Sequence, residues 1–392
     1  MTGPLEQIRV LDLTRLLPGP FCTQILGDLG AEVIKIEDPV GGDYIRGYPP
    51  RRQVDGALYL SINRNKKSLT LDLRLAEGRE IFLKMLLKAD VLIEQFRPGV
   101  MERLGLGYEK LKAVNPGLIM CSISGYGQTG PYKDLAGHDI NYLSTAGILD
   151  LIGSYEGAPV LPGIQIADIG GGSLWAAFSI MAALFAREKT RRGQYIDVAM
   201  MDSVFTYTCM LAGAYFMDHK IPRRGEELLN GGYAWYNVYR TRDDRYVALG
   251  MLEVKFWEKF CQAIEREDWI KKQFAPSPVQ REIIDQLAVV FASRTSEEWT
   301  RLLEPLDICF SRVNSLDEAV NDPHLRERGM VVEIDHPVEG RIFTLGFPVK
   351  FSDLNCEVRL SPPALGQHTE ELLQDLGYSA EEIGVLKNKQ VI

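Results

Sequence analysis

The sequence has few of the residues and patterns that mark several common protein classes. It contains five histidines and six cysteines in 392 residues, and no Cys stands in a C-x-x-C pair or beside a His at metal-ligand spacing. We therefore expect no metal site, and we interpret the cysteines as scattered buried thiols of a cytoplasmic protein. Lys and Arg number 44 against 53 Asp and Glu, a net charge of −9. Nucleic-acid binding needs a basic surface, so this class is excluded.

Long hydrophobic runs and targeting signals are also missing. The longest mostly apolar run covers residues 174–186, which is shorter than the roughly 20 residues needed to span a bilayer. We predict that it is a buried helix and that no membrane is involved. The first ten residues lack a basic segment followed by an apolar one, so no secretion signal is expected. The expected location is the cytoplasm or an organelle matrix.

What the chain does contain is a globular composition with alternating strand and helix patterns. Apolar residues make up 46% and charged residues 25%, and the length favours two domains. A strand–loop–helix–strand series at the N-terminus predicts a parallel sheet. The predicted large-domain elements are strands at 8–13, 31–36, 91–94 and 118–123, helices at 22–29, 77–89 and 370–376, and a loop at 18–20. A more helical region at 245–320, with helices at 282–292 and 296–303, predicts a smaller domain.

The beginning of the chain is like that of a dinucleotide-binding domain, with one important gap. The turn after the first strand is TRLLPGPF and lacks G-x-G-x-x-G. Without those glycines the backbone cannot approach a pyrophosphate closely, so NAD binding is not expected.

Seven segments resemble the class III CoA-transferase family, also called the carnitine dehydratase and bile-acid-inducible family. They are GPLEQIRVLDLT (3–14), LGDLGAEVIKIE (26–37), NKKSLTLDLR (65–74), EQFRPGVMERLGLGYE (94–109), ISGYGQTGPY (123–132), TRRGQYIDVAMMDS (190–203) and LGQHTEELLQDLGYSAEEI (365–383). The resemblance implies an enzyme of acyl-CoA thioesters and an interlocked homodimer. It also implies an α/β fold, with a Rossmann-like large domain and a smaller α+β domain. We predict the large domain at 1–204, a linker at 205–230, the small domain at 231–325, and a C-terminal return at 326–392.

Three further segments resemble the α-methylacyl-CoA racemase branch of that family. They are AGHDINYLS (136–144), PGIQIADIGGGS (162–173) and NGGYAWYNVYRTRDDRYVALGMLE (230–253). The resemblance implies that His138 and Asp168 are the catalytic acid/base pair, and that Glu253 assists from the partner subunit. In the transferases of the family the position of Asp168 is also acidic and acts as a nucleophile, whereas the position of His138 is usually Tyr or Phe.

The racemase chemistry suits these residue types. Inversion beside a thioester needs a base on one face of the carbon and an acid on the other, and imidazole and carboxyl groups can exchange these roles. Asp168 precedes three glycines and an apolar helix, so we predict that free backbone N–H groups there stabilise the enolate oxygen. No cofactor is expected beyond the CoA of the substrate.

Residues for the CoA moiety also follow from the resemblance. Arg97 and Arg103 are expected at the nucleotide phosphates, because Arg can bind a phosphate with two hydrogen bonds. The adenine is expected to lie along Leu71, Asp72, Leu73 and Arg74. Further CoA contacts are expected from Gly137, Asn141 and Tyr142. One departure is Asp38, where many relatives carry a phosphate-contacting Arg. We expect Lys35, Arg46 or Lys66 to compensate.

Three functions are therefore open. The first is a racemase or epimerase that inverts the 2-methyl carbon of a 2-methylacyl-CoA, and the second is a CoA-transferase that works through a thioester on Asp168. The third, a non-catalytic CoA-binding protein, is disfavoured by the presence of His138, Asp168 and Glu253 together. The Gly137–His138–Asp139 triplet favours the first function over the second.

Overall fold

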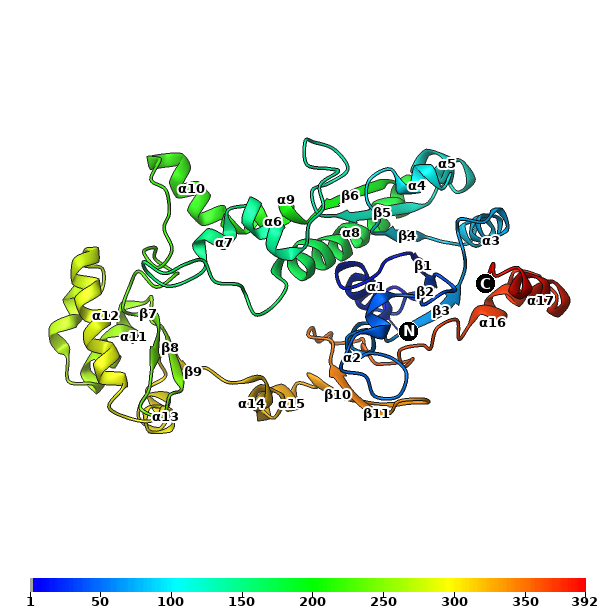
Figure 1. Cartoon of the computed structure of the whole chain (residues 1–392). Coiled ribbons are helices and arrows are strands. Elements are labelled where there is room, and N and C mark those ends of the chain that lie inside the picture. Colours follow the sequence, from blue (N-terminus) through cyan, green and yellow to red (C-terminus); the bar gives the residue numbers. More distant parts are fainter. Residues whose placement is uncertain (1–2) are drawn as a thin grey trace. The chain divides into compact units, whose positions relative to one another are not determined.

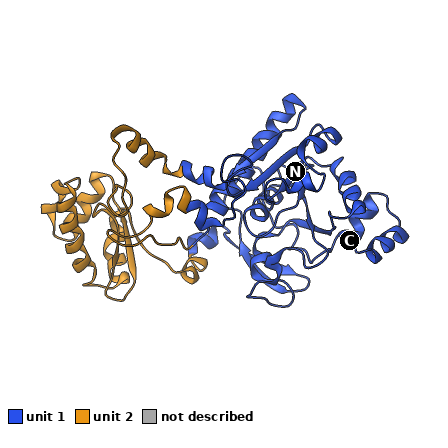
Figure 2. Cartoon of the chain, turned by 45° about the horizontal axis from the view of Figure 1, so that its top comes forward, with its two compact units in different colours: residues 1–143, 164–206, 323–392 blue, residues 144–163, 207–322 orange. Residues whose placement is uncertain are grey.

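The computed structural model describes residues 3–392 and divides the chain into two compact units (Figure 2). Unit 1 comprises residues 1–143, 164–206 and 323–392, and unit 2 comprises residues 144–163 and 207–322. The sequence placed 144–163 in the large domain and treated 205–230 as a linker, and here the structure differs. Arg224 donates to the carboxylate of Asp150 at 2.9 Å and to the carbonyl of Gly157 at 3.1 Å. These bonds join residues 144–163 to residues 207–230 within unit 2.

Unit 1 is built on a six-stranded sheet in the order β3-β2-β1-β4-β5-β6, with every pair parallel (Figure 1). The strands are β1 (Arg9–Asp12), β2 (Glu32–Glu37), β3 (Lys66–Thr70), β4 (Val91–Glu94), β5 (Ile119–Ser124) and β6 (Tyr195–Ala199). This is the order of the doubly wound dinucleotide-binding fold, whose switch point lies between β1 and β4. The predicted α/β class with a parallel sheet is confirmed.

Helices surround this sheet, and the C-terminal pair completes its core. They are α1 (Pro18–Asp28), η1 (Tyr44–Gly47), α2 (Ala57–Ile62), α3 (Ala76–Leu86), α4 (Val100–Arg103), α5 (Tyr108–Val114), α6 (Asp139–Thr145), η2 (Ala167–Leu174), α8 (Trp175–Thr190), α9 (Met200–Phe205), α15 (Pro323–Glu327), α16 (Thr369–Asp375) and α17 (Ala380–Asn388). A hairpin of β10 (Val331–His336) and β11 (Gly340–Leu345) is also part of unit 1. Leu372 and Leu386 from the last two helices pack in the same core as Leu11 and Ile34 from the first two strands. This explains why the chain returns to unit 1 at its C-terminal end.

The first helix begins earlier than the sequence pattern indicated. We predicted a loop at 18–20 and a helix from residue 22, but α1 begins at Pro18. Proline is favoured in the first turn of a helix because its fixed φ suits the helix and the N–H it lacks has no intrahelical acceptor there. The helix therefore begins six residues after β1 ends, and its N-terminal end lies at the carboxyl edge of the sheet.

The long apolar helix α8 is not the buried helix that we predicted. Leu174, Phe178 and Phe185 are 51%, 61% and 69% exposed, although Ala176 and Ile180 are fully buried. The run therefore has one face in the core and one apolar face outside it. With η2 it forms a continuous helix, Ala167–Thr190, that is long and apolar enough to cross a membrane by length and composition alone. A single helix of this kind is weak evidence for a membrane span, because core helices share these properties.

Unit 2 is a separate α+β body with an aromatic core. Its sheet is antiparallel in the order β7-β8-β9, with β7 (Tyr236–Arg240), β8 (Tyr246–Gly250) and β9 (Phe310–Arg312). Trp235, Trp257, Trp269, Phe260 and Phe291 are all almost completely buried between this sheet and the helices. The helices that pack on this core are α11 (Val254–Ala263), η4 (Glu267–Lys272), α12 (Ser277–Phe291), α13 (Ser296–Leu303) and η5 (Glu304–Leu306). Unit 2 also contains α7 (Ile148–Leu151), α10 (Cys209–Asp218) and α14 (Leu316–Val320), and η3 (Thr206–Thr208) lies where the chain passes from one unit to the other.

Candidate active site

Two cavities lie along the carboxyl edge of the sheet in unit 1. The central pocket, of about 360 Å³, is lined by residues that follow β1, β4 and β5, by the loop before α6 and by the ends of η2 and α9: Leu16, Pro18, Gln95, Phe96, Arg97, Pro98, Ile123, Ser124, Gly125, Tyr126, Lys133, Leu135, Ala136, Gly137, His138, Tyr142, Asp168 and Met200. The edge pocket, of about 410 Å³, is lined by residues at the ends of β1, β2, β3 and β4: Leu13, Arg15, Ile36, Glu37, Asp38, Val40, Gly42, Tyr44, Leu71, Asp72, Leu73, Arg74, Phe96, Val100 and Leu104. Ligands of this fold class bind at the carboxyl ends of the strands, near the switch point.

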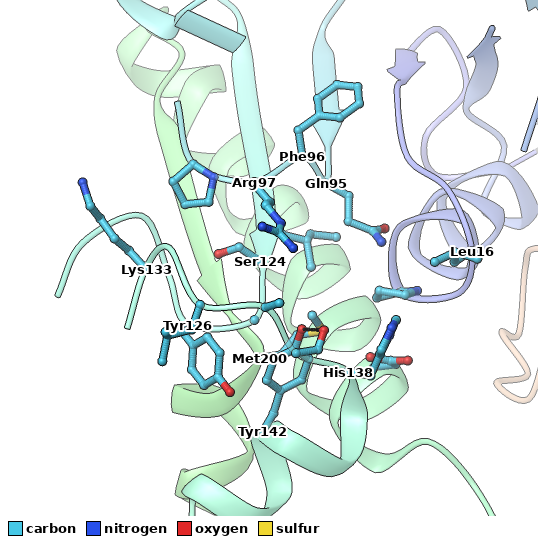
Figure 3. A pocket seen from close by; sticks show the side chains of 18 residues that line it. Leu16, Gln95, Phe96, Arg97, Ser124, Tyr126, Lys133, His138, Tyr142 and Met200 are labelled. Carbon is cyan, nitrogen blue, oxygen red and sulfur yellow. Dashed lines mark hydrogen bonds between the residues drawn. The ribbon is translucent and has the colours of Figure 1, made fainter. Parts of the chain in front are cut away.

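His138 and Asp168 both line the central pocket, although they are far apart in the sequence. The backbone of His138 is fixed at the start of α6, because its N–H donates to Asn141 Oδ1 at 3.0 Å and its carbonyl accepts from Asn141 N at 2.8 Å. His138 itself is exposed. Figure 3 shows His138 at the side of the pocket near Leu16, with Arg97 above it and Tyr126 and Tyr142 across from it.

Asp168 occupies the first turn of η2, a π-helix that continues into α8. Burial raises the pKa of its carboxyl from 3.8 to about 6, and the nearby negative charge of Asp139 adds to this, while His138 opposes it. The carboxylate of Asp139 also accepts from the backbone N–H of Ala167 at 2.6 Å and of Asp168 at 3.0 Å. Asp139 therefore caps η2 and tunes the pKa of Asp168. A carboxyl with a pKa near 6 can both release and take up a proton around neutral pH.

The glycines after Asp168 have a different role from the one predicted. We expected free N–H groups at this helix end to bind an enolate oxygen, but the first two, of Ala167 and Asp168, already donate to Asp139. A Cβ at Gly171 would lie 2.8 Å from the carbonyl oxygen of Met200, and one at Gly172 would lie 2.9 Å from Pro18 Cβ. Only glycine permits η2 to pack this closely against α9 and α1.

Two of the remaining predicted CoA contacts, Gly137 and Tyr142, form part of the wall of the central pocket. The hydroxyl of Tyr142 donates to the carbonyl of Gly137 at 2.5 Å, and both residues line the pocket. A Cβ on Gly125 would lie 2.3 Å from the Tyr142 ring, so glycine is required there. Burial raises the pKa of the Tyr142 hydroxyl, which keeps it protonated as a donor. Asn141 is not a lining residue and acts instead on the backbone of His138.

The residues expected for the nucleotide are divided among three places. Residues 71–74 all line the edge pocket, as the resemblance implies. Arg97 lines the central pocket, and Arg103 lines neither. Arg74 is engaged with two acids, since its Nε lies 2.8 Å from Asp72 and its Nη2 lies 3.3 Å from Asp38.

The cations expected to compensate for Asp38 cannot reach a ligand in this structure. Lys66 and Lys35 have fully buried side chains and pair with Asp12 at 3.3 Å and Asp43 at 3.0 Å. A second buried cluster holds Arg46, whose guanidinium binds Glu37 at 2.8 Å and Asp55 at 2.9 Å. The expectation that these three would compensate was therefore wrong. Their positive charges balance the buried carboxylates of Asp12, Asp43, Glu37 and Asp55.

Glu253 lies in unit 2, at the N-cap of α11, and is exposed. Its side chain makes no capping hydrogen bond within the described part of the chain. The residues that line the central pocket all belong to unit 1.

Sequence reasoning overlooked two residues at these pockets. Asp139 was treated only as part of a triplet, and its contact with residue 168 spans 29 positions, which no local pattern reveals. Arg15 follows the first strand and lines the edge pocket. Its place directly after β1, in the turn where a dinucleotide-binding fold holds its phosphates, is a signal that could have identified it.

Comparison with known proteins agrees with this geometry. The sequence model described as CoA-transferase family III matches residues 5–369. The chain belongs to this family. A CaiB/BaiF family protein from Brucella suis has a similar structure, with a TM-score of 0.83 at 31% identity over 96% of this chain and 100% of that one. The fold is therefore that of the family III enzymes, as predicted.

Sequence identity alone does not separate the two candidate reactions within CoA-transferase family III. The human alpha-methylacyl-CoA racemase is 34% identical over 99% of this chain and 97% of its own. The human succinyl-CoA:glutarate CoA-transferase is also 34% identical, over 99% of this chain and 90% of its own. The family consists of enzymes, and acyl-CoA thioesters fit it as substrates.

Proposed function

We propose that this family III enzyme is a racemase or epimerase that inverts the 2-methyl carbon of a 2-methylacyl-CoA. The observation that carries the proposal is the presence of both His138 and Asp168 in the central pocket. One of the two removes the α-proton, which leaves an enolate on the thioester, and the other returns a proton to the opposite face. One C–H bond breaks and one forms, so no second substrate and no cofactor is consumed.

Support for these roles comes from the electrostatics of the pocket. The pKa of Asp168, about 6, lets this carboxyl act in either direction near neutral pH. Arg97 in the same pocket supplies a positive charge that attracts the anionic CoA ester. Glu253 assists from unit 2 of the partner subunit, and its exposed place at the start of α11 suits that role.

The nucleotide portion of the CoA ester binds in the edge pocket in this proposal. Leu71, Leu73 and the stem of Arg74 provide a surface for the adenine there. The thioester then reaches the central pocket across the boundary between the two.

The enzyme acts as a homodimer. Exposed apolar side chains of α8 line a cavity of about 780 Å³. Its other lining residues include Leu5 from the segment before β1, and Phe347 and Phe351 from the segment after β11. Exposed apolar surface of this extent is typical of interfaces between subunits. We place the enzyme in the cytoplasm, because all six cysteines are free thiols, as expected in a reducing compartment.

A second candidate function is that of a CoA-transferase with Asp168 as nucleophile. The similarity of this chain to the human succinyl-CoA:glutarate CoA-transferase favours this candidate. In that reaction the Asp168 carboxylate attacks the donor thioester and forms an anhydride while CoA thiolate leaves. The thiolate then attacks the aspartyl carbonyl, which releases the donor acid and leaves a thioester on Asp168. The acceptor acid later reverses these steps and departs as the new CoA ester.

The His138→Gln variant tests the choice. As a racemase, this variant should lose inversion of a chiral 2-methylacyl-CoA, measured by chiral chromatography of the hydrolysed acid, and the wild type should need no added carboxylic acid. Transferase activity that survives in His138→Gln and depends on an acceptor acid would overturn the racemase proposal. Trapping of an aspartyl thioester on Asp168 by hydroxylamine would have the same meaning.

A further inference from the structure

The central and edge pockets meet at the switch point of the sheet. β1 and β4 are neighbours there, and the segments that follow them contribute to both cavities. Arg15 and Leu16 are consecutive, and the first lines the edge pocket while the second lines the central pocket. Phe96 lines both. A ligand that occupies both pockets must therefore pass between residues 15–16 and residues 96–97.

The helix that begins at this point cannot offer its backbone to a phosphate. In most folds of this class the N–H groups at a helix N-terminus bind the anion. The first three residues of α1 are Pro18, Gly19 and Pro20, and the two prolines have no N–H. The N–H of Gly19 donates to Gln95 Oε1 at 2.9 Å. An anion at the boundary of the pockets therefore needs a side-chain cation.

Arg15 is held in place there by aromatic neighbours. Its guanidinium carbon lies 5.3 Å from the ring centroid of Tyr44 and 5.9 Å from that of Phe96. Its Nη1 donates to the Tyr44 hydroxyl at 2.8 Å, which uses one of the five N–H donors of a guanidinium. Among residues 3–392, no carboxylate lies within ion-pair distance of Arg15.

The second cation that lines the edge pocket, Arg74, already forms ion pairs. Arg74 is shared by Asp72 and Asp38, which leaves its charge balanced by two acids. Without Arg15, the exposed charges of this pocket would be net negative and would repel a phosphate. Of the two cations that line the edge pocket, Arg15 and Arg74, Arg15 is thus the one with no ion pair to a carboxylate, and it lies next to Leu16 of the central pocket.

We propose that Arg15 binds the diphosphate of the CoA ester. The inference rests on the proposed placement of the adenine in the edge pocket and of the thioester in the central pocket. In CoA the diphosphate lies between the adenosine and the pantetheine arm, so it comes to the boundary between the pockets. The planar fork of Arg15, aligned by Tyr44 and Phe96, can bind two phosphate oxygens at once. Arg15 thus provides the anion contact that the N-terminus of α1 cannot provide, because Pro18 and Pro20 have no N–H.

Calorimetric titration of the full-length protein with CoA and with 3′-dephospho-CoA tests this assignment. Both ligands carry the diphosphate, but only CoA carries the 3′-phosphate. Arg15→Gln should weaken binding of both ligands by the same factor, about 10- to 100-fold, which is the range for a charged hydrogen bond. Arg15→Lys keeps the charge but not the fork, and it should show a smaller loss that is again equal for the two ligands. The matched control Arg191→Gln changes an exposed arginine at the C-terminal end of α8 that lines neither pocket, and it should bind both ligands as the wild type does.

Other outcomes would overturn the assignment. A loss seen with CoA but absent with 3′-dephospho-CoA would place Arg15 at the 3′-phosphate. Unchanged affinity in Arg15→Gln, or an equal loss in Arg191→Gln, would show that Arg15 does not bind the ligand. Because the readout is binding, it is separate from the reaction. A wild type that binds CoA but inverts no substrate overturns the racemase proposal and leaves the assignment of Arg15 standing.

Discussion

Asp139 accepts a hydrogen bond from the backbone N–H of Asp168, with 3.0 Å between the nitrogen and the carboxylate oxygen. The same carboxylate raises the pKa of the Asp168 side chain, after burial, which is the larger cause. Gly137 and His138 of the Gly137–His138–Asp139 triplet therefore line the central pocket, and Asp139 positions Asp168 and tunes its pKa.

Asp139→Asn should change the pH dependence of the enzyme more than its fold. Asn retains a carbonyl oxygen to accept the N–H of Asp168 but removes the negative charge, so the pKa of Asp168 should fall below its value of about 6. If Asp168 acts as the base, the acidic limb of kcat/KM should move to lower pH. A pH profile whose acidic limb stays in place, or moves to higher pH, would contradict this role of Asp139.

Asp168→Asn should abolish activity and yet stabilise the protein at neutral pH. The pKa of Asp168 is raised in the folded state, from 3.8 to about 6, so the folded state prefers the neutral carboxyl. Stability is therefore lost as pH rises from about 3.8 to about 6, and the charge costs up to about 3 kcal/mol above that window. Asn is never ionised and avoids this cost.

Calorimetric melting at two pH values measures this effect. The Tm of Asp168→Asn should exceed that of the wild type at pH 7.5, and the difference should narrow as the pH is lowered toward 4. The exposed Asp375→Asn serves as the control and should show no such pH dependence. A variant with a lower Tm at neutral pH would mean that the ionised carboxylate stabilises the fold.

Arg97 and Arg103 belong to one motif, but the structure predicts different effects for them. Arg97 lines the central pocket, whereas Arg103 is exposed and lines neither pocket. Arg97→Gln should raise KM for the CoA ester at least about tenfold, the effect of one lost charged hydrogen bond. Arg103→Gln, its matched control, should have little effect on steady-state kinetics. An equal rise in KM in the two variants would show that Arg103 also contacts the CoA ester.

Lys66→Met should strongly destabilise unit 1. Burial lowers the pKa of Lys66 to about 8, although the negative charge of Asp12 counteracts this. Removal of the ammonium group leaves the Asp12 carboxylate buried without its partner, which typically costs about 3–5 kcal/mol. Urea unfolding should show a much lower midpoint. Lys389→Met removes an exposed pair with Glu77 and should leave the midpoint nearly unchanged. Similar midpoints in the two variants would contradict this account.

Much of the sheet could be predicted from the sequence, because short apolar runs between turns are a strong signal. Strand β4 was predicted with the observed bounds, and β1, β2 and β5 differ by one residue at their ends. The start of α1 was misplaced because Pro-Gly-Pro is common in loops, and local patterns do not distinguish a loop from a proline-initiated first turn.

The errors at the site have a common physical origin in tertiary contacts. Lys35 and Lys66 are charged residues within strand patterns, and nothing in the sequence shows that buried acids surround them. The exposed apolar face of α8 could likewise not be predicted, because hydrophobic periodicity does not reveal which residues pack on a helix. His138 and Asp168 came from family resemblance. Their presence in one pocket, and the bond from Asp139 that links their segments, required the folded chain.

The most direct test of the central claim is proton NMR of an enantiopure 2-methylacyl-CoA incubated with the enzyme in D₂O. As a racemase, the wild type should replace the α-proton with deuterium while the configuration becomes mixed, with no added carboxylic acid. Retention of the α-proton and of the configuration, together with CoA transfer to an added acid, would contradict the account.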